Sequence, residues 1–266
     1  MGVVTYNNIG GFGRLGNQMF QIASTIGISL ENGLDYGFNP WVCKYTKINF
    51  NDYIKKPLKS LNLNNNPIVD ISERNFGYSP ILLEQSKNYR LHGYFQSEKY
   101  FKKHKEHIYN VFELSEDHMK NILEKYKNIL TNSCSLHIRR GDYIGLQSRH
   151  TLIGLDYYIN SLNKIYGDNI GGANLLIFSD DIEWCKKNIN IEGANIHFIQ
   201  GNVSIIDMYL ISLCDNNIIA NSSFSWWGAW LNKNDSKTVV APKNWFGPHN
   251  SHLLTKDLFC EGWIVL

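Results

Sequence analysis

The second half of the chain alternates strand-like apolar runs with helix-like segments, and this regularity restricts the possible folds more than any other feature. Strands that alternate with helices of such length form a parallel sheet covered by helices on both faces. The fold class is therefore α/β. The predicted strands are residues 133–140, 174–181, 194–200, 217–223 and 237–243, and the predicted helices are residues 155–167, 181–189, 203–216 and 224–232.

Polar motifs lie at the ends of several of these strands. They are HIRRGD at residues 137–142, FSDD at residues 178–181 and ANSSFS at residues 220–225. Ligands of parallel α/β sheets bind beyond the carboxyl ends of the strands. We therefore expect these motifs to line one crevice.

The first half of the chain predicts fewer regular elements. A strand at residues 3–9 leads through a glycine-rich loop into a helix at residues 15–33. From residue 38 to residue 89, prolines and polar residues break the chain, and no regular element is predicted there. The remaining predicted elements are a strand at residues 89–96, a helix at residues 98–112 that Ser97 caps, and a helix at residues 115–130.

The charge balance argues against a polyanionic partner. Lys and Arg number 26 against 24 Asp and Glu, which gives a formal net charge of +2, too small for nucleic-acid binding. The five cysteines lack any C-x-x-C spacing, which predicts buried free thiols rather than disulfides or a zinc site. The sequence shows no basic leader and no long apolar run, so it predicts a cytoplasmic protein.

The glycine-rich loop places Gly11, Gly13 and Gly16 in the pattern G-x-G-x-x-G. This pattern is compatible with a dinucleotide site, with a structural turn, or with a loop whose amides face an anionic ligand or a sugar. A dinucleotide site also needs an acidic residue at the end of a second strand, and the sequence offers only weak candidates. Asn17 and Gln18, directly after Gly16, favour the loop that faces a ligand.

The HIRRGD motif carries the most chemical information. Alternation along a strand places His137 and Arg139 on one side and Arg140 on the other, so the two arginines should have different roles. We assign Arg139 to a phosphate group, which its guanidinium can bind through paired hydrogen bonds. We expect Arg140 to make either a second contact with the phosphate group or a salt bridge with Asp142. A surface arginine pair beside a turn is the structural alternative.

The other two motifs also allow more than one interpretation. Asp180 and Asp181 can contact a base or a ribose hydroxyl, bind Mg²⁺, or cap the following helix. No second carboxylate cluster lies nearby in the sequence, so no metal site is expected. Ser222 and Ser223 stand at a strand-to-helix junction, where hydroxyls and free amides can hold a phosphate. The tryptophans of the following helix are expected to pack against the sheet, with a sugar platform as the alternative; they are Trp226, Trp227 and Trp230.

In this order, the segments GRLGNQMFQ, LHGYFQSEKYF, LHIRRGDY, FSDD and NSSFSWWGAWL resemble glycosyltransferase family 11, the α-1,2-fucosyltransferases that use GDP-fucose. The resemblance implies a GT-B-like architecture of two facing Rossmann-like domains, an inverting transfer and no metal requirement. Residues 1–130 would form the acceptor-side domain, which carries the glycine loop. Residues 131–266 would form the GDP-fucose-binding domain.

The resemblance also implies roles for individual residues. His137 and Arg139 would contact GDP, with Arg139 on the β-phosphate. Asp180 or Asp181 would contact guanine or ribose. The phosphate and ribose pocket would be lined by Ser222, Ser223 and Phe224. Asn17 and Gln18 would face the cleft from the first domain, where Gly13 is also a candidate substrate-binding residue.

The chemistry of such a transfer gives these assignments a physical basis. Breaking the sugar–phosphate bond leaves charge on the β-phosphate and an oxocarbenium-like sugar, so cationic and N–H donors must point at the leaving group. Arg139, the serine-lined helix start and the glycine loop can supply them without a metal. A carboxylate or imidazole should deprotonate the incoming hydroxyl, and Asp142 is our candidate, although a salt bridge with Arg140 would weaken it as a base.

The expected activity is therefore transfer of L-fucose from GDP-fucose to the 2-hydroxyl of a terminal β-galactoside in a surface glycan or lipopolysaccharide. The expected partners are GDP-fucose and a galactose-containing acceptor, with no separate cofactor and no nucleic acid. A lipid-linked acceptor would bring the protein to the inner face of the membrane. The alternatives are a different sugar-nucleotide donor on the same fold, an NAD-dependent oxidoreductase, and a non-catalytic binder of nucleotide sugars or glycans.

Overall fold

The computed structural model describes residues 1–266 as two compact units. The first unit comprises Met1–His118 and Leu253–Cys260, and the second comprises Met119–His252 and Glu261–Leu266. The main boundary thus lies inside helix α3 (Glu116–Tyr126), whereas the sequence pattern placed it after residue 130. The chain also returns to the first unit near its end, which the prediction of one continuous segment per domain did not include.

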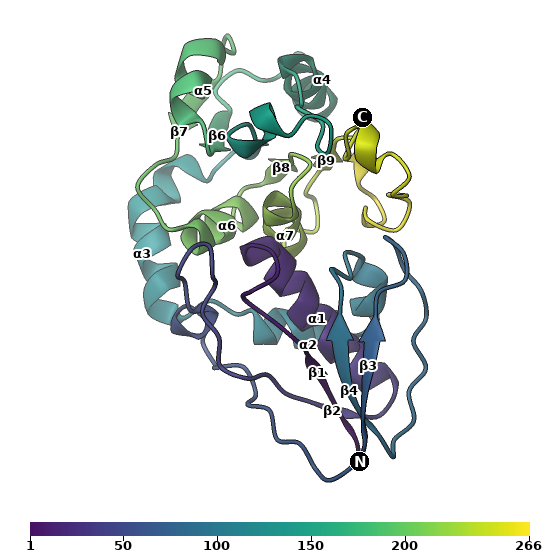
Figure 1. The fold of residues 1–266 in the computed structure, drawn as a ribbon. Helices are drawn as coiled ribbons and strands as arrows, with labels where there is room; N and C mark the ends of the chain where they lie inside the picture. Colours follow the sequence, from purple (N-terminus) through teal and green to yellow (C-terminus); the bar gives the residue numbers. More distant parts are fainter. The chain divides into compact units, whose positions relative to one another are not determined.

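The first unit contains a parallel sheet of four strands in the order β2-β1-β4-β3 (Figure 1). Its first strand runs into a glycine loop and then into a long helix, as predicted, because β1 is wholly buried and the helix buries most of its residues against the sheet. The elements are β1 (Val3–Tyr6), α1 (Leu15–Glu31), β2 (Asp35–Tyr36), β3 (Ile68–Ser72) and β4 (Asn88–His92).

Two predictions for this unit were wrong. Residues 38–89 are not free of regular structure, because β3 pairs along its whole length with β4, from Ile68 opposite Asn88 onward. As a mostly exposed edge strand, β3 lacks the apolar run that marks a buried strand.

The single helix predicted for residues 98–112 is divided into shorter elements, because Phe101 has a non-helical φ of −139° and buries its ring. These are η2 (Glu98–Tyr100), η3 (Lys102–His104) and α2 (Lys105–Val111), and a further short turn, η1 (Phe50–Asp52), precedes them. The predicted cap by Ser97 is confirmed, since its hydroxyl accepts a hydrogen bond from the amide of Lys99.

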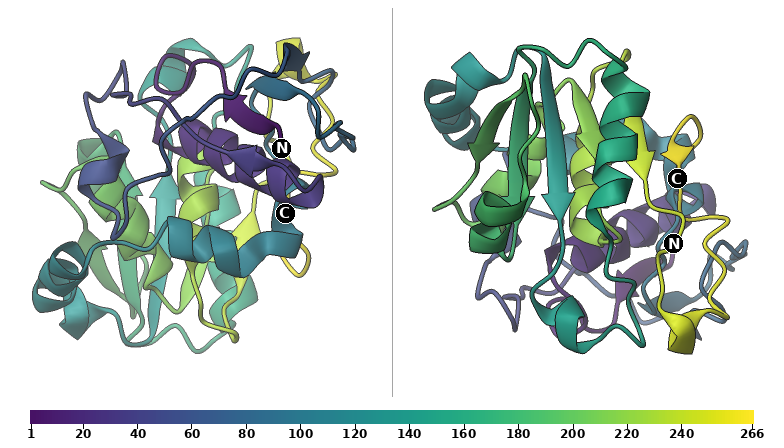
Figure 2. Two further views of the ribbon diagram at one scale, coloured as in Figure 1. Left: turned by 90° about the horizontal axis from the view of Figure 1, so that it is seen from below. Right: turned by 90° about the horizontal axis from the view of Figure 1, so that it is seen from above.

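The second unit contains a parallel sheet of six strands in the order β10-β9-β8-β5-β6-β7. Figure 2 (right) shows these strands lying side by side. Every strand predicted for this half is present, and β10 was not predicted. The strands are β5 (Ser133–Ile138), β6 (Asn174–Ser179), β7 (Asn195–Phe198), β8 (Asn216–Ile218), β9 (Val239–Ala241) and β10 (Ile264–Val265).

Helices cover both faces of this second sheet, as predicted: α4 and α5 lie on one face, and α6 and α7 lie on the other (Figure 1). The tryptophans of α7 pack inward, with Trp226 and Trp227 fully buried and Trp230 only 3% exposed. This confirms the packing role and leaves no exposed indole for a sugar. The helices are α4 (Leu155–Tyr166), α5 (Ile182–Asn188), α6 (Ser204–Ser212) and α7 (Ser223–Leu231). The shorter turns η4 (Lys127–Ile129) and η5 (Asp142–Gly145) precede them, and η6 (Pro248–Asn250) follows them.

The strand order of the second sheet reverses at β5, which lies between β6 and β8. Such a switch point opens a crevice at the carboxyl ends of the two strands from which the chain departs in opposite directions, and ligands of open α/β sheets bind there. The residues that follow β5 and β8 are the HIRRGD and ANSSFS motifs. The fold therefore predicts a ligand site at these two segments.

Two further predictions concern the cysteines, expected to be free thiols, and membrane-spanning segments, expected to be absent. All five cysteines are free thiols, of which Cys43, Cys134, Cys185 and Cys214 are buried and Cys260 is half-buried. None of the helices has both the length and the apolar character that a membrane span requires.

Candidate active site

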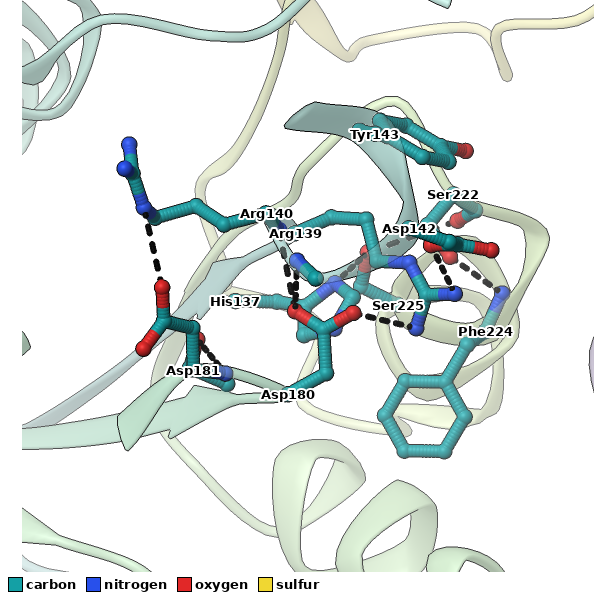
Figure 3. Close-up of polar contacts among 12 residues, drawn as sticks. His137, Arg139, Arg140, Asp142, Tyr143, Asp180, Asp181, Ser222, Phe224 and Ser225 are labelled. Carbon is teal, nitrogen blue, oxygen red and sulfur yellow. Dashed lines mark hydrogen bonds and ion pairs between the residues drawn. The ribbon is translucent and has the colours of Figure 1, made fainter. Parts of the chain in front are cut away.

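Strand β5 delivers the arginine motif to the crevice. Every residue from Ser133 to Ile138 is buried, so the strand is fixed by packing up to its last residue. His137 then faces α7, and Arg140 faces α5, as the alternation predicted. Figure 3 shows the guanidinium groups of Arg139 and Arg140 pointing to opposite sides.

The Arg139 guanidinium is held on two edges and one face. Its Nη2 lies 2.6 Å from Oδ1 of Asp142, and its Nη1 lies 3.0 Å from Oδ2 of Asp180. The ring of Tyr143 lies against its face, with 5.4 Å between the guanidinium carbon and the ring centroid. Since the Arg139 side chain is only 16% exposed, these contacts fix its orientation at the rim of the sheet.

Arg140 has different partners from those expected. Its Nε lies 3.5 Å from Oδ2 of Asp181, and its guanidinium carbon lies 3.7 Å from the ring centroid of Trp184. The expected alternative of an Arg140–Asp142 salt bridge was wrong, because Asp142 pairs with Arg139 instead. Arg140 therefore ties β5 to helix α5 through an ion pair and a cation–π contact.

Asp180 links the ends of two neighbouring strands. Its Oδ1 accepts hydrogen bonds from the backbone amides of Arg140 at 2.9 Å and Gly141 at 3.1 Å. The register that pairs Ile138 with Ser179 puts Asp180 beside this turn. A Cβ on Gly141 would lie 2.6 Å from Oδ2 of Asp180, so a larger residue at this position would displace the Asp180 carboxylate.

Asp181 caps helix α5. Its carboxylate accepts a hydrogen bond from the amide of Trp184 at 3.3 Å, which confirms the capping interpretation for this residue. The chain contains no group of three or more His, Cys, Asp or Glu side chains placed to hold a metal ion.

His137 is buried and neutral. Its Nδ1 lies 2.8 Å from the hydroxyl of Ser225, and the ring of Phe224 lies 5.2 Å away between centroids. Burial, with a smaller contribution from the charge of Arg139, lowers the pKa of His137 to about 3. A neutral imidazole with so low a pKa is a poor proton acceptor at neutral pH, so His137 is suited to hydrogen bonding rather than to general-base catalysis.

The start of helix α7 forms the other side of the crevice. Ser222 caps this helix, with its hydroxyl accepting from the amide of Phe224 at 3.4 Å, and Ser223 is the first helical residue. The preceding Asn221 donates to the carbonyls of Thr151 and Trp245, both at 2.8 Å. The helix N-terminus is therefore anchored, and its dipole favours an anion.

The glycine loop belongs to the first unit. Gly13 has a φ of +86°, and a Cβ there would lie 2.5 Å from the Cβ of Asn17, so only glycine fits. Gln18 is buried, donates to the Gly13 carbonyl at 3.2 Å and accepts from Trp41 Nε1 at 3.1 Å. Asn17 accepts from Gln96 at 2.8 Å. The structure thus brings Gly13, Asn17 and Gln18 together, and the hydrogen bonds of the buried Gln18 side chain stabilise the loop.

Sequence reasoning did not single out several residues that shape the crevice. Tyr143 supports Arg139 and donates to the Asn221 carbonyl at 3.0 Å, and His150 stacks on its ring at 4.5 Å. Ser225, one of the serines that the sequence places at the strand-to-helix junction of the ANSSFS motif, positions His137. Tyr143 stands inside the quoted segment LHIRRGDY, so its place after the strand was a usable signal, whereas nothing in the sequence points to His150.

The whole chain matches one family. The profile of Glycosyl transferase family 11 covers residues 3–266. The chain belongs to glycosyltransferase family 11. It is therefore a glycosyltransferase, and the resemblance that its motifs suggested is confirmed.

Two Escherichia coli proteins illustrate the relationship. The chain is 32% identical to "Alpha-1,2-colitosyltransferase" over an alignment of 285 positions, which covers 95% of this chain and 96% of that protein. It is 38% identical to "O-antigen biosynthesis glycosyltransferase WbnK" over 195 residues, which cover 69% of this chain. That second match spans only 63% of the relative, just under two thirds of its length.

The solved structures show the same fold at low sequence identity. One match is a crystal structure of NodZ alpha-1,6-fucosyltransferase soaked with GDP-fucose, with a TM-score of 0.54 and 13% identity. The match covers 86% of this chain and 92% of NodZ. The GT-B-like α/β architecture that the resemblance implied is therefore confirmed.

Proposed function

We propose that this family 11 enzyme is an inverting α-1,2-fucosyltransferase that moves L-fucose from GDP-fucose to the 2-hydroxyl of a terminal β-galactoside. One observation carries the proposal: Arg139 is fixed at the switch point of the second sheet, where helix α7 also begins. A diphosphate that binds there meets a guanidinium and a helix N-terminus together. The α-1,2 linkage in the name of the colitosyltransferase relative supports the regiochemistry.

The proposed roles follow from the contacts. As the bond between fucose and the β-phosphate breaks, its electron pair stays on the phosphate, and Arg139 and the α7 amides stabilise that charge. Ser222, Ser223 and Phe224 line the phosphate and ribose pocket. Neutral His137 donates or accepts a hydrogen bond with the nucleotide, and Asp180 or Asp181 contacts guanine or ribose.

Asp142 is the proposed general base. It shares the Nη2 edge of Arg139, so a diphosphate that binds this guanidinium competes with the Asp142 carboxylate. The released carboxylate takes the proton of the acceptor hydroxyl while that oxygen attacks the anomeric carbon from the side opposite the leaving phosphate. His137, with its pKa of about 3, is a much poorer candidate.

A second donor follows from one specific comparison. The relative matched over 95% of this chain is named for colitose, which is L-fucose without its 3-hydroxyl. GDP-colitose would use the same GDP contacts. The donors therefore differ only around the sugar ring, and both belong in the test.

The wider setting is also part of the proposal. The acceptor is a galactose-containing surface glycan or lipopolysaccharide precursor. The protein acts in the cytoplasm, and it associates peripherally with the inner membrane face when this acceptor is lipid-linked. No separate cofactor takes part.

The decisive experiment incubates the protein with lactose and GDP-fucose, followed by mass spectrometry and NMR of the new linkage. GDP-colitose, a UDP-sugar and an ADP-sugar run in parallel, with the Arg139→Ala variant as the inactive control. We expect a fucosylated trisaccharide with an α-1,2 linkage. Transfer from GDP-colitose alone would identify GDP-colitose, and not GDP-fucose, as the donor. Transfer only from a UDP- or ADP-sugar would refute the proposed GDP site.

A further inference from the structure

An aromatic stack stands at the carboxyl edge of the first sheet, and the roles proposed so far do not use it. Phe12, from the loop after β1, stacks on Tyr94 with 4.4 Å between ring centroids and 21° between ring planes. It also stacks on His92, the last residue of β4, at 5.3 Å and 26°. His92 is exposed, and Phe12 and Tyr94 are partly exposed. Three rings thus form a partly exposed aromatic cluster at the sheet edge where ligands of parallel sheets bind.

Buried amide groups hold the loop that carries Phe12. Gln21, which is fully buried in α1, donates from its side chain to the Phe12 carbonyl at 2.8 Å. Gln18 holds the next carbonyl, that of Gly13, at 3.2 Å. Helix α1 therefore fixes the backbone on which the Phe12 ring stands.

A carboxylate fixes the other side of the stack. Glu73, which directly follows β3, accepts from the amide of Tyr94 through Oε2 at 2.7 Å and from the amide of Phe95 through Oε1 at 2.9 Å. Phe95 has a φ of +51°, and Gly93 has a φ of +150°. The backbone around Tyr94 is thus held in an unusual conformation by both oxygens of one side chain, so the ring is preorganised.

Two amide side chains, those of Asn17 and Gln96, stand close in the sequence to the residues that carry the rings. Gln96, two residues after Tyr94, donates to Oδ1 of Asn17, whose side chain packs under Gly13, the neighbour of Phe12. A surface that combines fixed ring faces with amide groups suits a pyranose, because a sugar ring has C–H faces and a hydroxyl rim. One face of β-galactopyranose is well suited, since its axial 4-hydroxyl leaves a cluster of C–H bonds on the opposite side.

We propose that the stack of Phe12, Tyr94 and His92 is the platform on which the acceptor sugar lies. The chemical class of this ligand rests on the proposed function, because transfer requires a second sugar and the residues proposed for the donor come from the second unit. Glu73 is a positioning residue that acts through the backbone of Tyr94. The platform contributes to acceptor affinity and not to donor affinity.

The test separates the two substrates kinetically. Phe12→Leu and Tyr94→Leu keep apolar volume but remove the ring face. Each should raise the KM for lactose about fivefold to tenfold, while the KM for GDP-fucose stays within about twofold. Tyr53→Leu is the matched control, because Tyr53 also stacks on a histidine in the first unit, at 4.9 Å from His118. That control should leave both KM values unchanged.

A binding measurement makes the result independent of turnover. Ligand-observed NMR with methyl β-galactoside and lactose should show saturation transfer to the sugar C–H protons with the wild-type protein and the Tyr53→Leu variant, but much less with Phe12→Leu. Unchanged lactose KM in both platform variants, or an equal rise in the GDP-fucose KM, would overturn the platform while leaving the fucosyltransferase intact. Sugar binding that depends on Phe12 in a protein that uses no GDP-sugar would keep the platform and refute the proposed function. Absence of saturation transfer with every galactoside would refute the platform.

Discussion

The guanidinium of Arg139 and the carboxylate of Asp180 meet at 3.0 Å across two neighbouring strands, each residue lying just beyond the end of its own strand. The same carboxylate accepts the backbone amides that follow Arg139. One aspartate therefore fixes both the side chain and the turn that carries it. Most of the site's behaviour on mutation should follow from this arrangement.

Replacing Arg139 with lysine should lower kcat by about 100-fold to 1,000-fold while the protein remains folded. Lysine keeps the charge but cannot offer two parallel N–H donors to a phosphate. Steady-state kinetics with GDP-fucose and thermal unfolding measure the two effects. Arg90→Lys is the matched control, because Arg90 also makes a paired contact, with Asp70, on an exposed surface. Near-normal turnover in Arg139→Lys would remove Arg139 from the leaving-group role.

Two substitutions at Asp180 should separate its functions. Asp180→Asn can keep an oxygen for the amides of Arg140 and Gly141 but loses the charge beside Arg139. We expect lower turnover with a loss of unfolding free energy below about 1 kcal/mol. Asp180→Ala leaves both amides without this acceptor, and we expect it to lower the free energy of unfolding by about 1 to 3 kcal/mol. Equal stability of the two variants in urea denaturation would contradict the bracing role.

Acid should destabilise the protein through His137. Its pKa is about 3 in the folded state and about 6.5 when unfolded, so the unfolded state binds the extra proton between these values. His137 therefore leaves the free energy of unfolding unchanged above about pH 6.5. As the pH falls from there towards 3, it lowers that free energy by up to about 1.4 kcal/mol per pH unit. Urea denaturation across this range should show a shallower pH dependence for His137→Gln. Parallel curves for the two proteins would rule out a buried neutral His137.

Chelation should not abolish transfer. Asp180 and Asp181, the carboxylates that could bind Mg²⁺, already pair with arginines and accept backbone amides. We expect product formation from GDP-fucose and lactose to continue in excess EDTA. Loss of activity that Mg²⁺ or Mn²⁺ restores would instead identify the FSDD motif as a metal site.

The second sheet could be predicted from the sequence because its four central strands, β5, β6, β8 and β9, are mostly buried and its helices are short and regular. Strand β6 has its four central residues, Leu175–Phe178, buried, and so it appears in the sequence as an apolar run between polar ends. The edge strand β3 gave no such signal, since most of its side chains face solvent. Periodicity detects burial, and it fails where pairing occurs without burial.

The ion pairs of the site could be predicted only in part. Alternation along a strand correctly separated the two arginines, but it could not show which carboxylate each would meet. Asp142 is close to both in sequence, and the choice of Arg139 depends on the turn at Gly141. The contact with Asp180 depends on the register of β5 against β6, which is a tertiary property.

The last stretch of the chain serves both units in turn. Asp257 accepts from the amide of Tyr78 at 3.1 Å and pairs with Lys99 in the first unit, and the residues after it supply strand β10 to the second sheet. These residues are synthesised after the other parts of both units. Neither unit can therefore complete its structure before they are made, and a proteolytic cut after His252 would damage both at once.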